Sequence, residues 1–97
     1  MNPLICADSM TWEHLMGERD RQAVYAEPVA VPCQWEPVSG ETRSPNGDIS
    51  EYRVEVITEQ TGIMAGDRIT KGETYEVIRV DEVRMRGHLH HYEVYAR

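Results

Sequence analysis

The clearest pattern in the chain is a pair of runs near its C-terminus in which apolar and polar residues alternate. Residues 73–85 read ETYEVIRVDEVRM and residues 88–96 read HLHHYEVYA, and both runs are rich in Val, Ile and Tyr. This composition and alternation are typical of half-buried β-strands. Arg86-Gly87 separates the runs, and glycine accepts the positive φ that a tight turn requires. We therefore predict a long antiparallel hairpin over residues 73–96.

The same alternation appears in two runs upstream. Residues 51–58 alternate apolar with charged side chains, the apolar ones being Tyr52, Val54 and Val56. Residues 27–36 place one set of side chains on a single side of a strand, namely Val29, Val31, Cys33 and Trp35. Pro28 and Pro32 fall on the other side, and a proline cannot donate a hydrogen bond to a neighbouring strand. This strand is therefore expected at a sheet edge or at a bulge.

Residues 11–16 (TWEHLM) fit two patterns. Trp12, Leu15 and Met16 match one helical turn, whereas Trp12, His14 and Met16 alternate as in a strand. Six residues make a poor isolated helix, so we expect a strand that ends at Gly17. With no helical run elsewhere, the sequence predicts an all-β fold of about five or six strands, closed as a small antiparallel barrel, SH3-like or sandwich-like.

A polar segment interrupts this pattern at residues 39–50 (SGETRSPNGDIS). It contains two glycines and a proline, and Ile49 is its one strongly apolar residue. Connections of this length inside a compact domain are usually functional or disordered. A chain of 97 residues is one domain by default. We expect residues 1–9 to form an N-terminal arm and residues 10–97 a single small barrel with a loop protruding at 39–50.

The charge distribution restricts the possible partners. The net charge is −7, with eight acids and three bases in residues 1–48 and nine and seven in residues 49–97. Neither half offers the basic field that generic binding to nucleic acid needs. The acidic excess indicates either an ordinary solvated surface or a protein past which DNA slides without sticking. No apolar run approaches the ~20 residues of a membrane span, and the N-terminus lacks the basic start of a signal peptide.

Candidate chemistry is sparse. His88, His90 and His91 form an HxHH cluster in which His88 and His90 would point the same way on a strand, and Glu93 or His14 would have to supply a third metal ligand. A solvated histidine cluster or a subunit contact explains the same spacing, because isolated ligand-type residues are a weak metal signal. A metal-dependent enzyme using these histidines is kept only as a remote alternative.

The residues offer even less support for nucleophilic or acid–base catalysis than for a metal site. There is no GxSxG turn, and Cys33 falls on the apolar side of its strand. Asp81 and Glu82 are adjacent, so on a strand they face opposite sides. The two cysteines, Cys6 and Cys33, have no CxxC spacing and are expected to be reduced, apolar side chains in a cytosolic protein. We predict no catalytic residues, no metal and no cofactor, and hence a protein that is not an enzyme.

One pattern is more specific than its parts. Gly66-Asp67-Arg68-Ile69 is followed by Tyr75-Glu76-Val77 and then by Val80. This resembles a signature of tailed-phage head-closure proteins, the stopper or head-completion proteins of siphophage-like connectors. In that family a Gly-Asp-basic-apolar turn precedes an aromatic-x-Val strand that opens a long hairpin. Residues 29–37 (VAVPCQWEP) are similar to the family's second strand, especially in phages of actinobacteria, and the resemblance spans residues 10–97.

The resemblance implies a structural virion protein of the neck, assembled in the cytoplasm of the bacterial host. Such proteins form a homo-oligomeric ring that docks under the adaptor and portal proteins, closes the DNA exit channel after packaging and offers a surface to tail-terminator or tail-tube proteins. DNA passes through without sequence-specific binding, and no membrane is involved. The alternative is a small SH3-like interaction module of a cellular protein.

The resemblance also assigns residues to two roles. The family's turn signature falls on Gly66, Asp67, Tyr75 and Val77. The loop after the second strand projects into the channel and gates it, and here that loop holds Gly40, Glu41, Arg43, Ser44, Asn46, Gly47 and Asp48.

Overall fold

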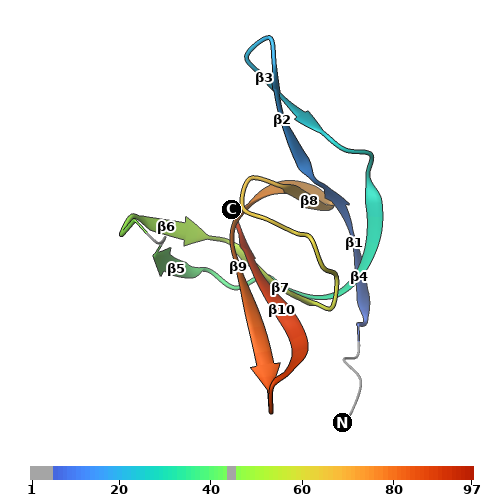
Figure 1. Cartoon of the computed structure of the whole chain (residues 1–97), viewed down its shortest axis with the longest axis vertical. Helices are drawn as coiled ribbons and strands as arrows, with labels where there is room; N and C mark the ends of the chain where they lie inside the picture. Colours follow the sequence, from blue (N-terminus) through green and yellow to red (C-terminus); the bar gives the residue numbers. More distant parts are fainter. Residues whose placement is uncertain (1–5, 44–45) are drawn as a thin grey trace.

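The computed structural model describes residues 6–43 and 46–97, and every regular element in them is a β-strand (Figure 1). In chain order the strands are β1 (Asp8–Glu13), β2 (Leu15–Arg19), β3 (Gln22–Tyr25), β4 (Val29–Glu36), β5 (Gly40–Arg43), β6 (Ile49–Tyr52), β7 (Val54–Thr58), β8 (Arg68–Lys71), β9 (Glu73–Met85) and β10 (His88–Ala96). None of the described residues belongs to a helix that is long and apolar enough to cross a membrane.

Six strands close a barrel in the order β1-β4-β7-β10-β9-β8, and all their pairings are antiparallel. The inward side chains form one core, which consists of Met10, Val31, Cys33, Val54, Val56, Ile63, Ile69, Val77, Val94 and Ala96. Burial of these aliphatic side chains is the main favourable term in folding, at roughly 1.5–3 kcal/mol for each large one. The predicted all-β antiparallel barrel is confirmed.

The C-terminal hairpin forms as predicted. β9 and β10 pair along most of their length, and the turn between them is Arg86-Gly87, with φ of 53° and 80°. Two positive φ values in a two-residue loop match the right-handed twist of the flanking strands. The pairing is irregular between Leu89 and His91, so the histidines do not follow the simple alternation that the sequence suggested.

The proline-containing strand was expected at a sheet edge or at a bulge. The strand as a whole is not at an edge, because β4 lies between β1 and β7 in the barrel, and its pairings show no register shift. β4 pairs with β1 through residues 29–33 and with β7 only through residues 34–36. Pro32 therefore lies where the ladder is one-sided, and its carbonyl accepts a hydrogen bond from Thr58 Oγ1 at 2.9 Å. One-sided pairing accommodates a residue that has no N–H to donate.

The N-terminal boundaries also differ from expectation. Asp8 and Ser9, which we assigned to the arm, belong to β1, and the Asp8 carboxylate accepts a hydrogen bond from the backbone N–H of Trp35 at 3.1 Å. Residues 1–5 lie outside the described residues. The strand expected over residues 11–16 exists but breaks at His14, and Gly17 lies within β2 instead of ending it. The strand expected over residues 51–58 breaks at Arg53.

Two hairpins project from the barrel as separate two-stranded sheets, β2–β3 at the top of Figure 1 and β5–β6 at its left. The β2–β3 hairpin turns at Asp20-Arg21, with φ of 52° and 66°. The segment at 39–50, which we expected as an irregular loop, is largely the β5–β6 hairpin, with Gly40 opposite Tyr52 and Arg43 opposite Ile49.

Candidate functional site

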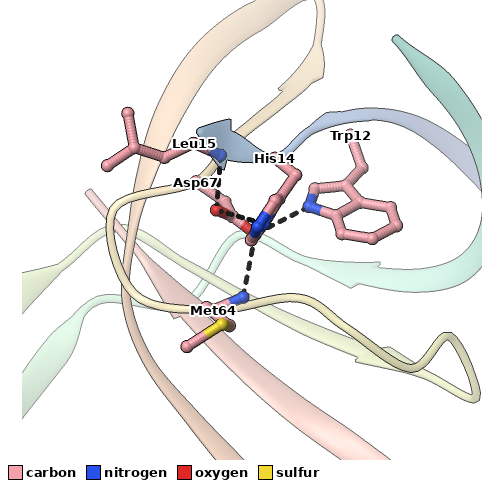
Figure 2. Close-up of polar contacts among 5 residues, drawn as sticks. All are labelled: Trp12, His14, Leu15, Met64 and Asp67. Carbon is pink, nitrogen blue, oxygen red and sulfur yellow. Dashed lines mark hydrogen bonds and ion pairs between the residues drawn. The ribbon is translucent and has the colours of Figure 1, made fainter. Parts of the chain in front are cut away.

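The side chain of Asp67 is the most heavily hydrogen-bonded group in the described part of the chain (Figure 2). Its carboxylate is fully buried and accepts hydrogen bonds from Trp12 Nε1 at 2.8 Å, from the Leu15 N–H at 2.8 Å and from the Met64 N–H at 2.9 Å. His14 Nδ1 lies 3.0 Å from Oδ1. The carboxylate thus joins β1, the start of β2 and the loop before β8.

The electrostatics of Asp67 follow from these contacts. Burial alone raises the pKa of the carboxyl, but the hydrogen bonds from Leu15, Trp12, Met64 and His14 together outweigh burial and lower the pKa below its ordinary value of 3.8. A buried charge is tolerated only where it is paired and hydrogen-bonded. Asp67 is therefore an ionised structural anchor.

Gly66 fixes the chain next to this anchor. Its φ is 97°, and a Cβ there would lie 3.0 Å from Leu15 Cδ2, so both conformation and space favour glycine. The Gly66 N–H donates to the Val77 carbonyl at 2.8 Å, and the Val77 N–H donates to the Asp67 carbonyl at 2.9 Å. These bonds attach the turn to β9.

Tyr75 and Val77 complete the predicted signature. Tyr75 packs edge-on against Trp35, with ring centroids 5.4 Å apart, and the Arg53 guanidinium lies 4.9 Å above the Tyr75 ring. Val77 is fully buried in the core. All four signature residues thus lie where β8 and β9 join the barrel, and their contacts are structural.

The base of the β5–β6 hairpin is clamped to the barrel. A Cβ at Gly40 would collide with the Tyr52 ring, so glycine lets the two strands close around that ring. Tyr52 in turn packs edge-on against Tyr95 of β10, with centroids 4.9 Å apart. This aromatic pair ties the hairpin to the outer face of the barrel.

Arg79 of β9 holds the hairpin at a second point. Its Nη1 donates to Thr42 Oγ1 at 3.0 Å and to the Arg43 carbonyl at 2.9 Å, while its Nε donates to Asp81 at 2.8 Å. Within the hairpin, Arg43 Nη1 donates to the Gly47 carbonyl at 3.2 Å.

Most of the predicted gating residues come together in this hairpin. Gly40, Glu41 and Arg43 lie in β5, and Asn46, Gly47 and Asp48 lie between Arg43 and β6. Glu41 faces Glu51 across the two strands. Ser44, the remaining predicted gating residue, lies outside the described residues.

A groove of about 880 Å³ separates the β5–β6 hairpin from the barrel. Its walls are the hairpin, the loop at 62–65 and β9, and its lining includes the apolar residues Ile63, Met64, Ala65, Ile78, Val80 and Tyr92. The charged lining residues are Arg43, Arg79, Asp81 and Glu82. A second hollow of about 570 Å³ also borders the hairpin, next to Asn46, Asp48, Glu76 and Arg97.

The sequence did not predict this groove. Three segments that lie far apart in the chain form the groove, and no local sequence pattern indicates that they come together in the folded protein. The apolar residues of β9 were visible in the alternation, but nothing indicated that the loop at 62–65 and the β5–β6 hairpin would stand on either side of them.

The histidine cluster does not form the metal site that was considered. His90 and His91 contact one another, with ring centroids 4.8 Å apart, and His91 Nε2 lies 3.4 Å from Glu93 Oε1. His14, one suggested third ligand, contacts Asp67 instead. Within residues 6–43 and 46–97, no group of three His, Cys, Asp or Glu side chains is arranged to hold a metal ion.

The two cysteines are unpaired with each other and have different environments. Cys33 is fully buried, whereas Cys6 is half-buried. Burial, with smaller contributions from Asp8 and Cys6, raises the pKa of the Cys33 thiol to about 11. The thiolate is the reactive form of cysteine, so Cys33 is an inert core residue.

No model of a known protein family matches the chain, and no curated protein matches it.

Proposed function

We propose that the protein is a structural subunit of a phage head-to-tail connector. In this role copies of the chain form a ring, the stopper, which closes the DNA exit channel after packaging and gives the tail its attachment surface. The observation that carries the proposal is the position of residues 40–43 and 46–52. They leave a closed barrel as a projecting hairpin attached at Tyr52 and bridged by Arg79.

The charges of the hairpin fit a plug that blocks DNA without binding it. Glu41, Asp48 and Glu51 outnumber Arg43 among the charged residues of 40–52, and the phosphate backbone is itself anionic. Hairpins from several copies, pointing toward a common axis, narrow the channel by their volume. DNA then passes once the hairpins move aside, with no sequence-specific contact to break.

The remaining surface serves protein partners. In the proposed ring, one face contacts the adaptor or portal on the head side, and the other contacts the tail-terminator or tail-tube protein. Gly66, Asp67, Tyr75 and Val77 all have contacts that fix how β8 and β9 join the barrel, so in this proposal the signature residues maintain the fold of the subunit and do not bind the partners.

The test is DNA retention by filled heads. A variant in which residues 41–50 are replaced by a short Gly-Ser linker keeps the barrel strands, so we expect a folded protein and heads that lose their DNA. A variant with Glu27→Gln, at an exposed position outside the hairpin, is the control and should retain DNA. Normal retention by the linker variant would show that this hairpin does not close the channel.

One observation favours the alternative of an SH3-like interaction module. The groove between the β5–β6 hairpin and β9 is lined by both apolar and charged residues, which is a common composition for a ligand site. That alternative predicts a monomer in solution that binds a peptide in this groove, whereas the stopper predicts self-association.

A further inference from the structure

The outer edge of β9 is open over most of its length. β9 pairs with β10 on one side through residues 77–85, but β8 covers its other side only at residues 73–76. Gly66 and Asp67 then bond to Val77. Among the described residues, none forms a strand ladder with the outer edge of residues 78–85. Unpaired backbone donors and acceptors of this kind can add a further strand.

The groove described above runs beside this open edge. Residues 78–82 form one wall, and the loop at 62–65 faces them. Its volume of about 880 Å³ is within the range that holds a bound ligand. Met64, beside the groove, is 59% exposed. The groove therefore offers an incoming strand both backbone partners and an apolar surface.

The β2–β3 hairpin is a second element with an uncovered surface. Residues 16–24 are all exposed, and they include the large apolar side chains of Met16 and Val24, 68% and 39% exposed. The hairpin is held at its base, where the Arg68 guanidinium lies 3.7 Å from the centre of the Tyr25 ring. Beyond that base it projects into solvent (Figure 1). A lone two-stranded hairpin is at best marginally stable in water, and this one leaves Met16 and Val24 exposed, which a binding partner would cover.

We infer that the β2–β3 hairpin of one copy docks in the groove of a second copy, as an added strand on the open edge of β9. The hairpin tip carries charges of alternating sign at Glu18, Arg19, Asp20 and Arg21. Beside the groove, Arg79 is paired with Asp81, and Glu82 is paired with Arg84, so these charges are already satisfied within the chain. The contact rests instead on backbone hydrogen bonds to the open edge of β9 and on Met16 and Val24, which cover the apolar lining residues of the groove.

This contact joins two different surfaces of the chain, so each copy keeps a free hairpin and a free groove. Such head-to-tail contacts generate a closed ring when the rotation between copies divides a full turn. The inference rests on the self-association in the proposed function. It is independent of whether the β5–β6 hairpin gates DNA.

Cross-linking tests the contact directly. In a Cys6→Ser background, where Cys33 stays buried, a Val24→Cys variant is mixed with Glu82→Cys or with Arg84→Cys and oxidised. We expect a disulfide-linked dimer in at least one of these mixtures, and a ladder of higher species from the corresponding double variant. Val38→Cys replaces a valine outside both surfaces that is somewhat more exposed than Val24, 47% against 39%, and should give none. A Val24→Cys chain that links to neither β9 position overturns the inference.

Light scattering separates this inference from the proposed function. Met16→Asp or Val24→Asp places a charge in the docked apolar contact. Each should raise the protein concentration at which half of the chains are associated about tenfold or more, whereas Val38→Asp should not. Circular dichroism checks that each variant is folded. If the variants assemble like the wild type, the hairpin contact is refuted and the ring stands. If the wild type stays at 11.2 kDa at every concentration, both fail.

Discussion

Trp12 Nε1 donates a hydrogen bond to Asp67 Oδ2 at 2.8 Å, although 55 positions separate the two residues in the chain. The contact joins β1 to the turn that precedes β8. β1 and β8 are neighbouring strands in the barrel, so the buried carboxylate of Asp67 fixes their relative position. The turn signature on which the resemblance rests thus has a definite physical task, which is to hold the barrel closed.

Replacing Asp67 with Asn should destabilise the protein strongly. The amide group of Asn brings N–H donors to a site where Trp12, Leu15 and Met64 already donate. Leaving such buried groups unpaired costs about 1–3 kcal/mol each, so we expect a loss of about 3 kcal/mol or more in the free energy of unfolding. Urea denaturation measures it, with Glu27→Gln as an exposed control that should change little.

The same carboxylate predicts how stability depends on pH. The pKa of Asp67 is lower in the folded protein than its ordinary value of 3.8. Its contribution is therefore fully present above that ordinary value and is lost as the pH falls through the lower, folded pKa. Unfolding measured between neutral and acidic pH should show this loss in the wild type and a smaller one in Asp67→Asn. Equal acid sensitivity of both proteins would contradict an ionised anchor.

Glu55 should be an unfavourable carboxylate at neutral pH. Burial, together with the nearby charges of Glu93 and Glu36, raises its pKa, and Glu36 lies directly opposite it in the β4–β7 ladder. Because the folded-state pKa is raised, the penalty is present at neutral pH and is relieved as the pH falls through that pKa.

The substitution Glu55→Gln removes this unfavourable charge. Like charges opposite each other on neighbouring strands cost roughly 0.2–1 kcal/mol, so we expect a gain in stability of about that size at neutral pH. The gain should shrink in acid, as thermal unfolding at two pH values would show. Glu59→Gln, at an exposed position, is the control, and a gain that persists unchanged in acid would rule out the electrostatic explanation.

The two thiols should differ in reactivity. Cys33 is fully buried with its pKa raised to about 11, and burial with the charge of Glu59 also raises the pKa of the half-buried Cys6. A colorimetric thiol reagent at neutral pH should therefore label native Cys6 slowly and leave Cys33 unlabelled until denaturant is added. The Cys6→Ser variant should show no native labelling, and rapid labelling of that variant would contradict a closed core.

Arg79 should control the mobility of the β5–β6 hairpin. Its guanidinium donates hydrogen bonds to Thr42 and the Arg43 carbonyl, so Arg79→Ala removes these two restraints and keeps the attachment at the base of the hairpin. We expect faster hydrogen exchange in residues 40–43 and 46–52 and unchanged exchange in β4 and β7. Arg84→Ala, which removes a neighbouring arginine bonded to Glu82, should leave the hairpin as it is. Equal exchange in both variants would show that Arg79 does not restrain it.

The barrel and its C-terminal hairpin were predictable because alternation over 73–96 is long and Gly87 marks the turn. The β2–β3 hairpin was not predictable in this way, because the two turn residues with positive φ values are Asp20 and Arg21, and neither is a glycine. The position of β4 was mispredicted for a related reason. The sequence shows the proline but not that one half of the strand pairs only with β1.

The candidate site was predicted in part. Residues 39–50 were expected to protrude as a loop, and the described residues 40–43 and 46–50 do project, but as part of a hairpin. The pairing of these short polar strands was not visible in the sequence, because they hold only one strongly apolar residue. The contacts of Asp67 depend on tertiary structure, because its donors come from Trp12, His14, Leu15 and Met64. The open edge of β9 was equally hidden, because it depends on where β8 ends.

We propose that copies of this chain close into a ring, and the mass of the purified protein under native conditions tests this most directly. Native mass spectrometry should find a single discrete multiple of 11.2 kDa, in equilibrium with the monomer and favoured as concentration rises. A monomer at every concentration, or an open series of multiples with no preferred size, would contradict the account.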